Sequence, residues 1–249
     1  MKIAILTDIH EDIVSLERVF HSMQDIDIDK VVCLGDITGY SPLFYSHQPD
    51  ANACLDLLRK NADIVVAGNH DLFTAGRLPS YHIQKRMADN WYELTVDERL
   101  QMTKNKVWLY QDEILPELSD KNKDYIQHLK EWETLTDNSR KYLFTHFFHP
   151  DMSGVGKWFP FNGLEIKEHF RFMKENNCRM SFLGHSHPPG CIMVNKLIWT
   201  HAEEETIQVK MHHKAVICPA VAHGKHPGGY IVFDTVRQTI KTIIVNPGM

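Results

Sequence analysis

The chain carries pairs and short groups of histidine and acidic residues that could together hold metal ions. Asp8 and His10 are separated by one residue, and so are His185 and His187. Side chains two positions apart in an extended chain point the same way, so each pair can reach a single site. Carboxylate, amide and imidazole donors without thiolates suit Mn²⁺, Fe or Zn²⁺ better than Cu(I) or an iron–sulfur cluster. The candidate metal ligands are Asp8, His10, Asp36, Asn69, His146, His185 and His187.

This set of ligands exceeds what one catalytic ion needs, since a single catalytic zinc usually takes three protein ligands and a water. The donors therefore suggest two divalent ions that share one carboxylate. Two ions about 3.5–4 Å apart form a clamp for in-line displacement at phosphorus, because they can hold the phosphate oxygens and the attacking hydroxide. We expect Mn²⁺, with Fe or Zn²⁺ as alternatives that the same ligands accept.

Short apolar runs directly precede most of these ligands and indicate buried strands. The expected strands are 2–7, 31–34, 64–67, 141–145 and 179–183. Apolar residues at helical spacing predict helices over 12–23, 51–60 and 164–176. The alternation of strands and helices predicts parallel strands with right-handed crossovers. Because ligands bind beyond the carboxyl ends of such strands, the candidate metal ligands should meet at one edge of the sheet.

The middle and the last third of the chain follow other patterns. Residues 77–135 are rich in charged and aromatic residues, which predicts an insertion of two or three helices beside the sheet. The last third predicts a second, largely antiparallel sheet built from short strands over 191–200, 205–218, 229–234 and 239–245. We therefore expect a single domain over residues 1–249 that contains the helical insertion.

Composition narrows the class of protein and its partners. The 249 residues are 43% hydrophobic and 24% charged, which is typical of a soluble globular protein. The net charge of −5 gives no basic surplus for phosphate-backbone binding, so nucleic acid is not a favoured partner. No apolar run suggests an export signal or a membrane span. The five cysteines are odd in number and widely spaced, which favours a cytoplasmic protein without disulfides.

The order of these motifs resembles that of the calcineurin-like metallophosphoesterase superfamily, over residues 1 to about 235. The blocks that carry the resemblance are Asp8-x-His10, Gly35-Asp36, Gly68-Asn69-His70-Asp71, His146 and Gly184-His185-x-His187. The resemblance implies an α/β (α+β) fold, a four-layer αββα sandwich of two mixed sheets flanked by helices. It also implies a metal-dependent phosphoesterase in which a metal-bridging hydroxide attacks phosphorus.

The resemblance assigns a role to each of the matching residues. The first metal would be held by Asp8, His10, Asp36 and His187. The second metal would be held by Asp36, Asn69, His146 and His185, with Asp36 bridging both ions. His70 matches the family histidine that protonates the leaving group or stabilises the transition state.

The segment Gly35-Asp36-Ile37-Thr38-Gly39-Tyr40 separates this chain from one branch of the superfamily. Serine/threonine protein phosphatases carry G-D-x-x-D-R-G, and the second Asp and the Arg are absent here. The form G-D-x-x-G-Y is similar to that of small bacterial and archaeal phosphodiesterases. We therefore expect the substrate to be a phosphoester of a small molecule such as a nucleotide, with a diester favoured over a monoester. The alternatives are a nuclease, a phosphatase, or a non-catalytic scaffold that keeps the fold.

Two loops depart from that branch and could face the substrate. His149 follows the fourth strand where the branch often has H-G, and the loop around 218–226 stands where it often has N-P-G-S. Residues of such loops either contact a phosphate or leaving group, or are solvated. The candidate substrate contacts are His149, His223, Lys225 and His226. The oligomeric state stays open, and the insertion could be a lid, a dimer surface or packing.

Overall fold

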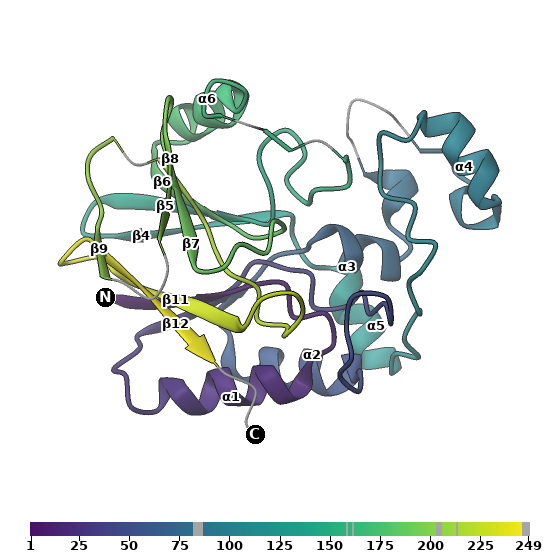
Figure 1. The fold of residues 1–249 in the computed structure, drawn as a ribbon, viewed down its shortest axis with the longest axis horizontal. Coiled ribbons are helices and arrows are strands. Elements are labelled where there is room, and N and C mark those ends of the chain that lie inside the picture. Colours follow the sequence, from purple (N-terminus) through teal and green to yellow (C-terminus); the bar gives the residue numbers. More distant parts are fainter. Residues whose placement is uncertain (82–86, 158, 161, 203–205, 213, 246–249) are drawn as a thin grey trace.

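Two six-stranded mixed sheets pack face to face in the computed structural model, which describes residues 1–81, 87–157, 159–160, 162–202, 206–212 and 214–245 (Figure 1). The first sheet has the order β3 (Ile64–Val65), β2 (Lys30–Cys33), β1 (Lys2–Leu6), β11 (Gly228–Asp234), β12 (Thr239–Val245) and β9 (Thr206–Gln208). The second sheet has the order β4 (Trp132–Asp137), β5 (Arg140–Thr145), β6 (Cys178–Leu183), β10 (Ala215–Ile217), β7 (Cys191–Val194) and β8 (Trp199–Ala202).

Alternate residues of β1 serve two different cores, which explains why its sequence is continuously apolar. Ile3 and Ile5 face the second sheet and share a core with Phe144 and Phe182, whose rings stack with centroids 5.6 Å apart. The residues between them face the helices on the outer side of the first sheet. A strand buried on both faces has no polar alternation, so the apolar run predicts burial correctly.

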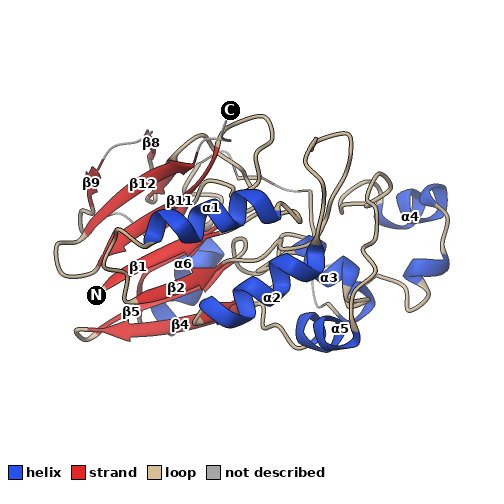
Figure 2. Ribbon diagram, turned by 90° about the horizontal axis from the view of Figure 1, so that it is seen from below, coloured by secondary structure: helices blue, strands red, loops and turns tan. Residues whose placement is uncertain are grey.

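Helices cover the outer faces of both sheets and complete four layers. On the first sheet lie α1 (Ile13–Met23) and α2 (Ala51–Asn61), each begun by an aspartate whose side chain accepts a backbone N–H bond (Figure 2). On the second sheet lies α6 (Lys167–Glu175), at the top of Figure 1. The predicted αββα sandwich of two mixed sheets is confirmed. Every helix in the described part of the chain is too short or too polar to cross a bilayer.

The segment 77–135 contains less helix than its composition suggests. It holds two α-helices, α4 (Val96–Thr103) and α5 (Asp120–Gln127), two single 3-10 turns and long loops in its described part. Trp132, which lies within the segment predicted to be helical, begins β4 and packs edge-on against Phe172 with ring centroids 5.4 Å apart. Its spacing from Tyr125 and Leu129 imitates a helical face, but pairing with β5 decides the conformation.

The last third does not form a sheet of its own. β11 lies antiparallel beside β1 in the first sheet, and β12 and β9 extend that sheet. The expected strand 205–218 is two strands, because β9 joins the first sheet and β10 the second. The expectation of a separate antiparallel sheet is therefore wrong: apolar patterning identifies these strands, whereas long-range pairing assigns them to a sheet.

Candidate metal centre and active-site cavity

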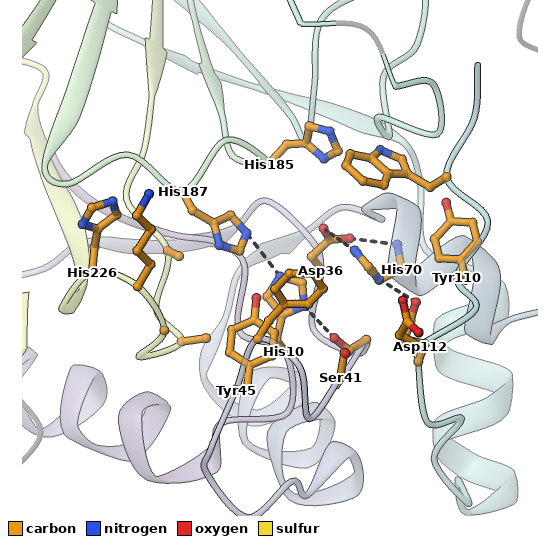
Figure 3. A pocket seen from close by; sticks show the side chains of 18 of the residues that line it. His10, Asp36, Ser41, Tyr45, His70, Tyr110, Asp112, His185, His187 and His226 are labelled. Atoms are coloured by element: carbon orange, nitrogen blue, oxygen red, sulfur yellow. Dashed lines mark hydrogen bonds and ion pairs between the residues drawn. The ribbon is translucent and has the colours of Figure 1, made fainter. Parts of the chain in front are cut away.

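Loops that follow five different strands carry the predicted metal ligands. Figure 3 shows His10, Asp36, His185 and His187 of this set around one cavity. The structure forms two groups, each with ligand atoms within 4.8 Å of one another: Asp8, His10 and His187, and then Asp36, His146 and His185. Both groups consist mainly of buried side chains. Carboxylates and imidazoles gathered in this way match the donor chemistry of Mn²⁺, Fe or Zn²⁺.

In the first group, nitrogen and oxygen atoms point into one small space. His10 donates from Nδ1 to the carbonyl oxygen of Gly39 at 2.9 Å, which leaves the lone pair of Nε2 free. That Nε2 lies 3.3 Å from Nε2 of His187, and the same His187 atom lies 3.1 Å from Oδ1 of Asp8. A backbone bond to the far ring nitrogen fixes the tautomer, as is usual for metal-binding histidines.

In the second group, as in the first, a backbone bond fixes one histidine ring and the ligand atoms lie close together. His146 donates from Nδ1 to the carbonyl oxygen of Leu34 at 2.9 Å, and its Nε2 lies 2.9 Å from Oδ2 of Asp36. The Nε2 atom also lies 3.2 Å from Nδ1 of His185. Asn69 is fully buried beside this group, and neither atom of its side-chain amide has a hydrogen-bond partner. A buried amide oxygen without a partner is costly, and a cation would satisfy it.

Four of the buried ligands carry the charges that cation binding requires. Burial alone would raise the pKa of Asp8 and Asp36, but neighbouring histidines, His187 and His146 above all, hold both values well below the ordinary range. Burial lowers the pKa of His10 and His185 to about 3, so both rings are neutral. Ionised carboxylates and neutral imidazoles are the forms that bind metals. His146 differs, because Asp36 outweighs the effect of burial and raises its pKa to about 9, so this ring must lose a proton to bind a metal.

Backbone strain accompanies the ligands. Asp8, His10, Asp36, His185 and His187 all have positive φ, between 45° and 70°. Non-glycine residues rarely adopt this conformation, which costs about 1–3 kcal/mol per residue and persists where the surroundings impose it. Concentration of this strain at the ligands indicates that the fold maintains the site at the expense of local stability.

His70 lies next to the second group, at the start of α3 (Asn69–Thr74). Its backbone N–H donates to Oδ1 of Asp36 at 3.0 Å, and its Nδ1 lies 2.9 Å from Oε2 of Glu113. Burial alone would lower the pKa of His70, but Asp36 and Glu113 raise it to about 10. The ring therefore holds a proton beside the metal ligands, where a general acid would stand.

A sequence model of the calcineurin-like phosphoesterase family matches residues 1–189, which include the whole ligand set. The chain belongs to this family. It is therefore a metal-dependent hydrolase of phosphoesters, and the ligand geometry fits divalent ions. The family resemblance inferred from the sequence motifs is confirmed.

Solved structures share this fold at low sequence identity, and one further protein is similar in sequence over part of the chain. A metallophosphoesterase from Sphaerobacter thermophilus superposes with a TM-score of 0.66 at 20% identity, covering 100% of this chain and 90% of that one. The hypothetical protein PH1004 from Pyrococcus horikoshii OT3 gives 0.63 at 16% identity, covering 99% and 88%. The uncharacterized protein MJ0912 of Methanocaldococcus jannaschii is 35% identical over 75 residues, which is 30% of this chain and 28% of that protein.

A cavity of about 460 Å³ opens over the metal ligands of this phosphoesterase. Lys225 and His226, two of the predicted substrate contacts, line the cavity. The other two do not: the ring of His149 stacks on Phe172 with centroids 4.5 Å apart, and the backbone of His223 donates to Asp12. Spacing along a loop could not distinguish these positions.

Other cavity residues carry no signal in the sequence. Tyr45 stacks on His10 with ring centroids 4.9 Å apart, and Phe159 stacks on His185 at 5.2 Å. Trp108 and Glu113 reach the cavity from the segment 77–135. None of these residues belongs to a spaced motif, and only the folded chain brings them to the ligands.

Proposed function

We propose that this phosphoesterase is a phosphodiesterase that uses two divalent metal ions to hydrolyse a phosphodiester of a small molecule such as a nucleotide. The observation that carries the proposal is that members of both ligand groups, His10 and His187 and then Asp36 and His185, line one cavity of about 460 Å³. Figure 3 shows His226 and Tyr110 at opposite ends of the view, with His10, Asp36 and His187 between them. A diester has a substituent on each side of phosphorus, and the cavity offers room for both.

The ligand groups support two adjacent ions. Asp8, His10, Asp36 and His187 would hold the first ion, and Asp36, Asn69, His146 and His185 the second. We favour Mn²⁺, with Fe or Zn²⁺ as alternatives, because oxygen and imidazole donors accept all three. Bound ions would activate water and neutralise the charge of the phosphate group.

The chain's own residues would bind the diester and manage its protons. His70 has about a quarter of its side chain exposed and can donate a proton to the oxygen of the leaving group. Lys225 and His226 would attract the phosphate or a polar part of a substituent. Aromatic rings such as Trp108 and Phe159 would pack against a flat or apolar substituent.

The cysteines bear on where this hydrolysis would take place. All five are free in the structure, and only Cys178 is more than slightly exposed. Unpaired, buried thiols are stable in a reducing compartment. We therefore favour the cytoplasm as the place of action.

The first experiment compares hydrolysis of bis-p-nitrophenyl phosphate with that of p-nitrophenyl phosphate, with added Mn²⁺ and after chelation. The proposal expects turnover of the diester that exceeds turnover of the monoester and disappears with chelator. Asp36→Asn should abolish turnover, because Asp36 lies within the second ligand group and 3.9 Å from His70. Preference for the monoester would make the protein a phosphatase, and turnover that survives chelation would contradict the metal requirement.

A further inference from the structure

The segment 77–135 contributes a carboxylate to the active site. Glu113 lies in the loop between α4 and α5, and its Oε2 is 2.9 Å from Nδ1 of His70. Only 4% of the Glu113 side chain is exposed, although it is a charged residue on a loop. A carboxylate buried to this extent needs a partner, and the ring of His70 supplies it.

The backbone around Glu113 is fastened to the loop that carries Asp36. Ile114 donates its N–H to the carbonyl oxygen of Tyr40 at 3.0 Å, the single bridge between these segments. Tyr110 stacks on Phe73 of α3 with ring centroids 4.3 Å apart. Both contacts hold the loop against the site, so the position of Glu113 is fixed by its neighbours.

Two aromatic rings surround the ring of His70, and Glu113 determines the orientation of that ring. Tyr110 meets it edge-on with centroids 5.5 Å apart, and His10 lies 5.0 Å away, also edge-on. These rings restrict tilting but do not choose which nitrogen faces the cavity. The hydrogen bond from Nδ1 to Glu113 determines the orientation of the ring. It places Nε2 on the cavity side, where this atom lies 3.9 Å from Oδ2 of Asp36.

We infer that Glu113 is a positioning residue, which orients His70 so that its Nε2 proton points at the oxygen of the leaving group. The inference rests on the proposed phosphodiesterase function. In the step concerned, water forms a new P–O bond and loses a proton to solvent, while the ester P–O bond breaks. The departing oxygen takes the Nε2 proton of His70, which later regains one from solvent. Glu113 keeps its hydrogen bond to Nδ1–H throughout and reaches no reacting atom.

The kinetic test uses two diesters that differ only in their leaving group, 4-nitrophenol or an aliphatic alcohol. Glu113→Ala should lower kcat about ten- to hundredfold for the alkyl leaving group and only a few-fold for nitrophenol, with little change in KM. Glu113→Gln keeps a hydrogen-bond acceptor and should fall between. Glu117→Gln removes the same charge from an exposed site of the same loop and is the control. Equal losses with both leaving groups, or no loss, would overturn the inference.

A spectroscopic test separates this inference from the proposed function. In the Zn²⁺-loaded full chain labelled with ¹⁵N-histidine, the signals of His70 are assigned by their loss in His70→Asn. They should show a protonated, hydrogen-bonded Nδ1 that changes in Glu113→Ala and not in Glu117→Gln. If the wild type hydrolyses neither diester, the phosphodiesterase proposal fails while this comparison still decides about Glu113. Identical His70 signals in Glu113→Ala would overturn the positioning role.

Discussion

The Nε2 atoms of His10 and His187 lie 3.3 Å apart across a buried space. His10 donates its Nδ1–H to the carbonyl oxygen of Gly39, so its Nε2 carries a lone pair. Oδ1 of Asp8 lies 3.1 Å from the same His187 atom, and that carboxylate is ionised. Atoms of this kind converge at low cost only when a proton or a metal cation stands among them, and the carboxylate and imidazole donors suit a metal ion. Their arrangement therefore gives a direct prediction about metal content.

We predict that the metal-saturated wild-type chain binds two divalent ions and that each ligand group holds one of them. His187→Asn and His185→Asn should each reduce the content to about one ion per chain, because each removes a donor from one group only. Metal is counted by plasma mass spectrometry after gel filtration. His128→Asn, which changes a histidine with 75% of its side chain exposed, should retain both ions. A wild-type content of one ion would contradict the two-ion site.

We predict that His70→Asn lowers kcat about 10²- to 10⁴-fold, the contribution typical of a general acid. Metal content should not change, because neither ligand group includes His70. Turnover and metal content are measured on the same preparation, with Mn²⁺ added. Undiminished turnover would remove His70 from the reaction, and loss of an ion would show that it acts as a ligand.

The ligand set was predictable because every member lies within four residues of the end of a strand. Asp8 and His146 come directly after buried apolar runs, so local patterning places them at the carboxyl edge. The bonds from His10 to Gly39 and from His146 to Leu34 were not predictable, nor was the place of Glu113, because these contacts join segments that are separate along the chain. Sequence patterns indicate local conformation. Contacts between segments that are distant in sequence complete the site.

The fold shows the same division between local and distant effects. The family resemblance implied the four-layer architecture, and apolar runs and helical spacing located many of its elements. The place of β11 beside β1, by contrast, depends on a contact more than two hundred residues apart in sequence. The sequence of β4 contains a tryptophan at a helix-like spacing, and only its pairing with β5 makes it a strand. Intrinsic preference is a weak guide where such pairing decides.

We predict that His169 makes the fold less stable in acid. It is fully buried in α6, where Nδ1 accepts the backbone N–H of His149 and Nε2 donates to Ser181 Oγ at 2.9 Å. Burial lowers its pKa to about 3, while the unfolded chain takes up the proton near the model-compound value of 6.5. Between these values the unfolded state binds more protons, so the free energy of unfolding should decrease as pH falls, by up to about 1.4 kcal/mol per pH unit.

The measurement compares urea unfolding of the wild type with that of His169→Gln between pH 4 and pH 8. Glutamine is neutral throughout, so the difference in stability between the two proteins should shrink or reverse as the solution is acidified. Above pH 6.5 this difference should be constant. A difference that does not depend on pH would mean that the pKa of His169 is the same in the folded and unfolded states, contrary to the environment described.

We predict that Lys225→Met raises KM for an anionic diester about two- to fivefold with little change in kcat. Lys225 lines the cavity from an exposed loop, and an exposed charge adds a modest, salt-sensitive attraction. Steady-state kinetics at low and at high salt check this, because the variant and the wild type should converge as salt rises. Lys241→Met changes an exposed lysine of β12 outside the cavity and should behave as the wild type. A fall in kcat with unchanged KM would instead place Lys225 at the reacting atoms.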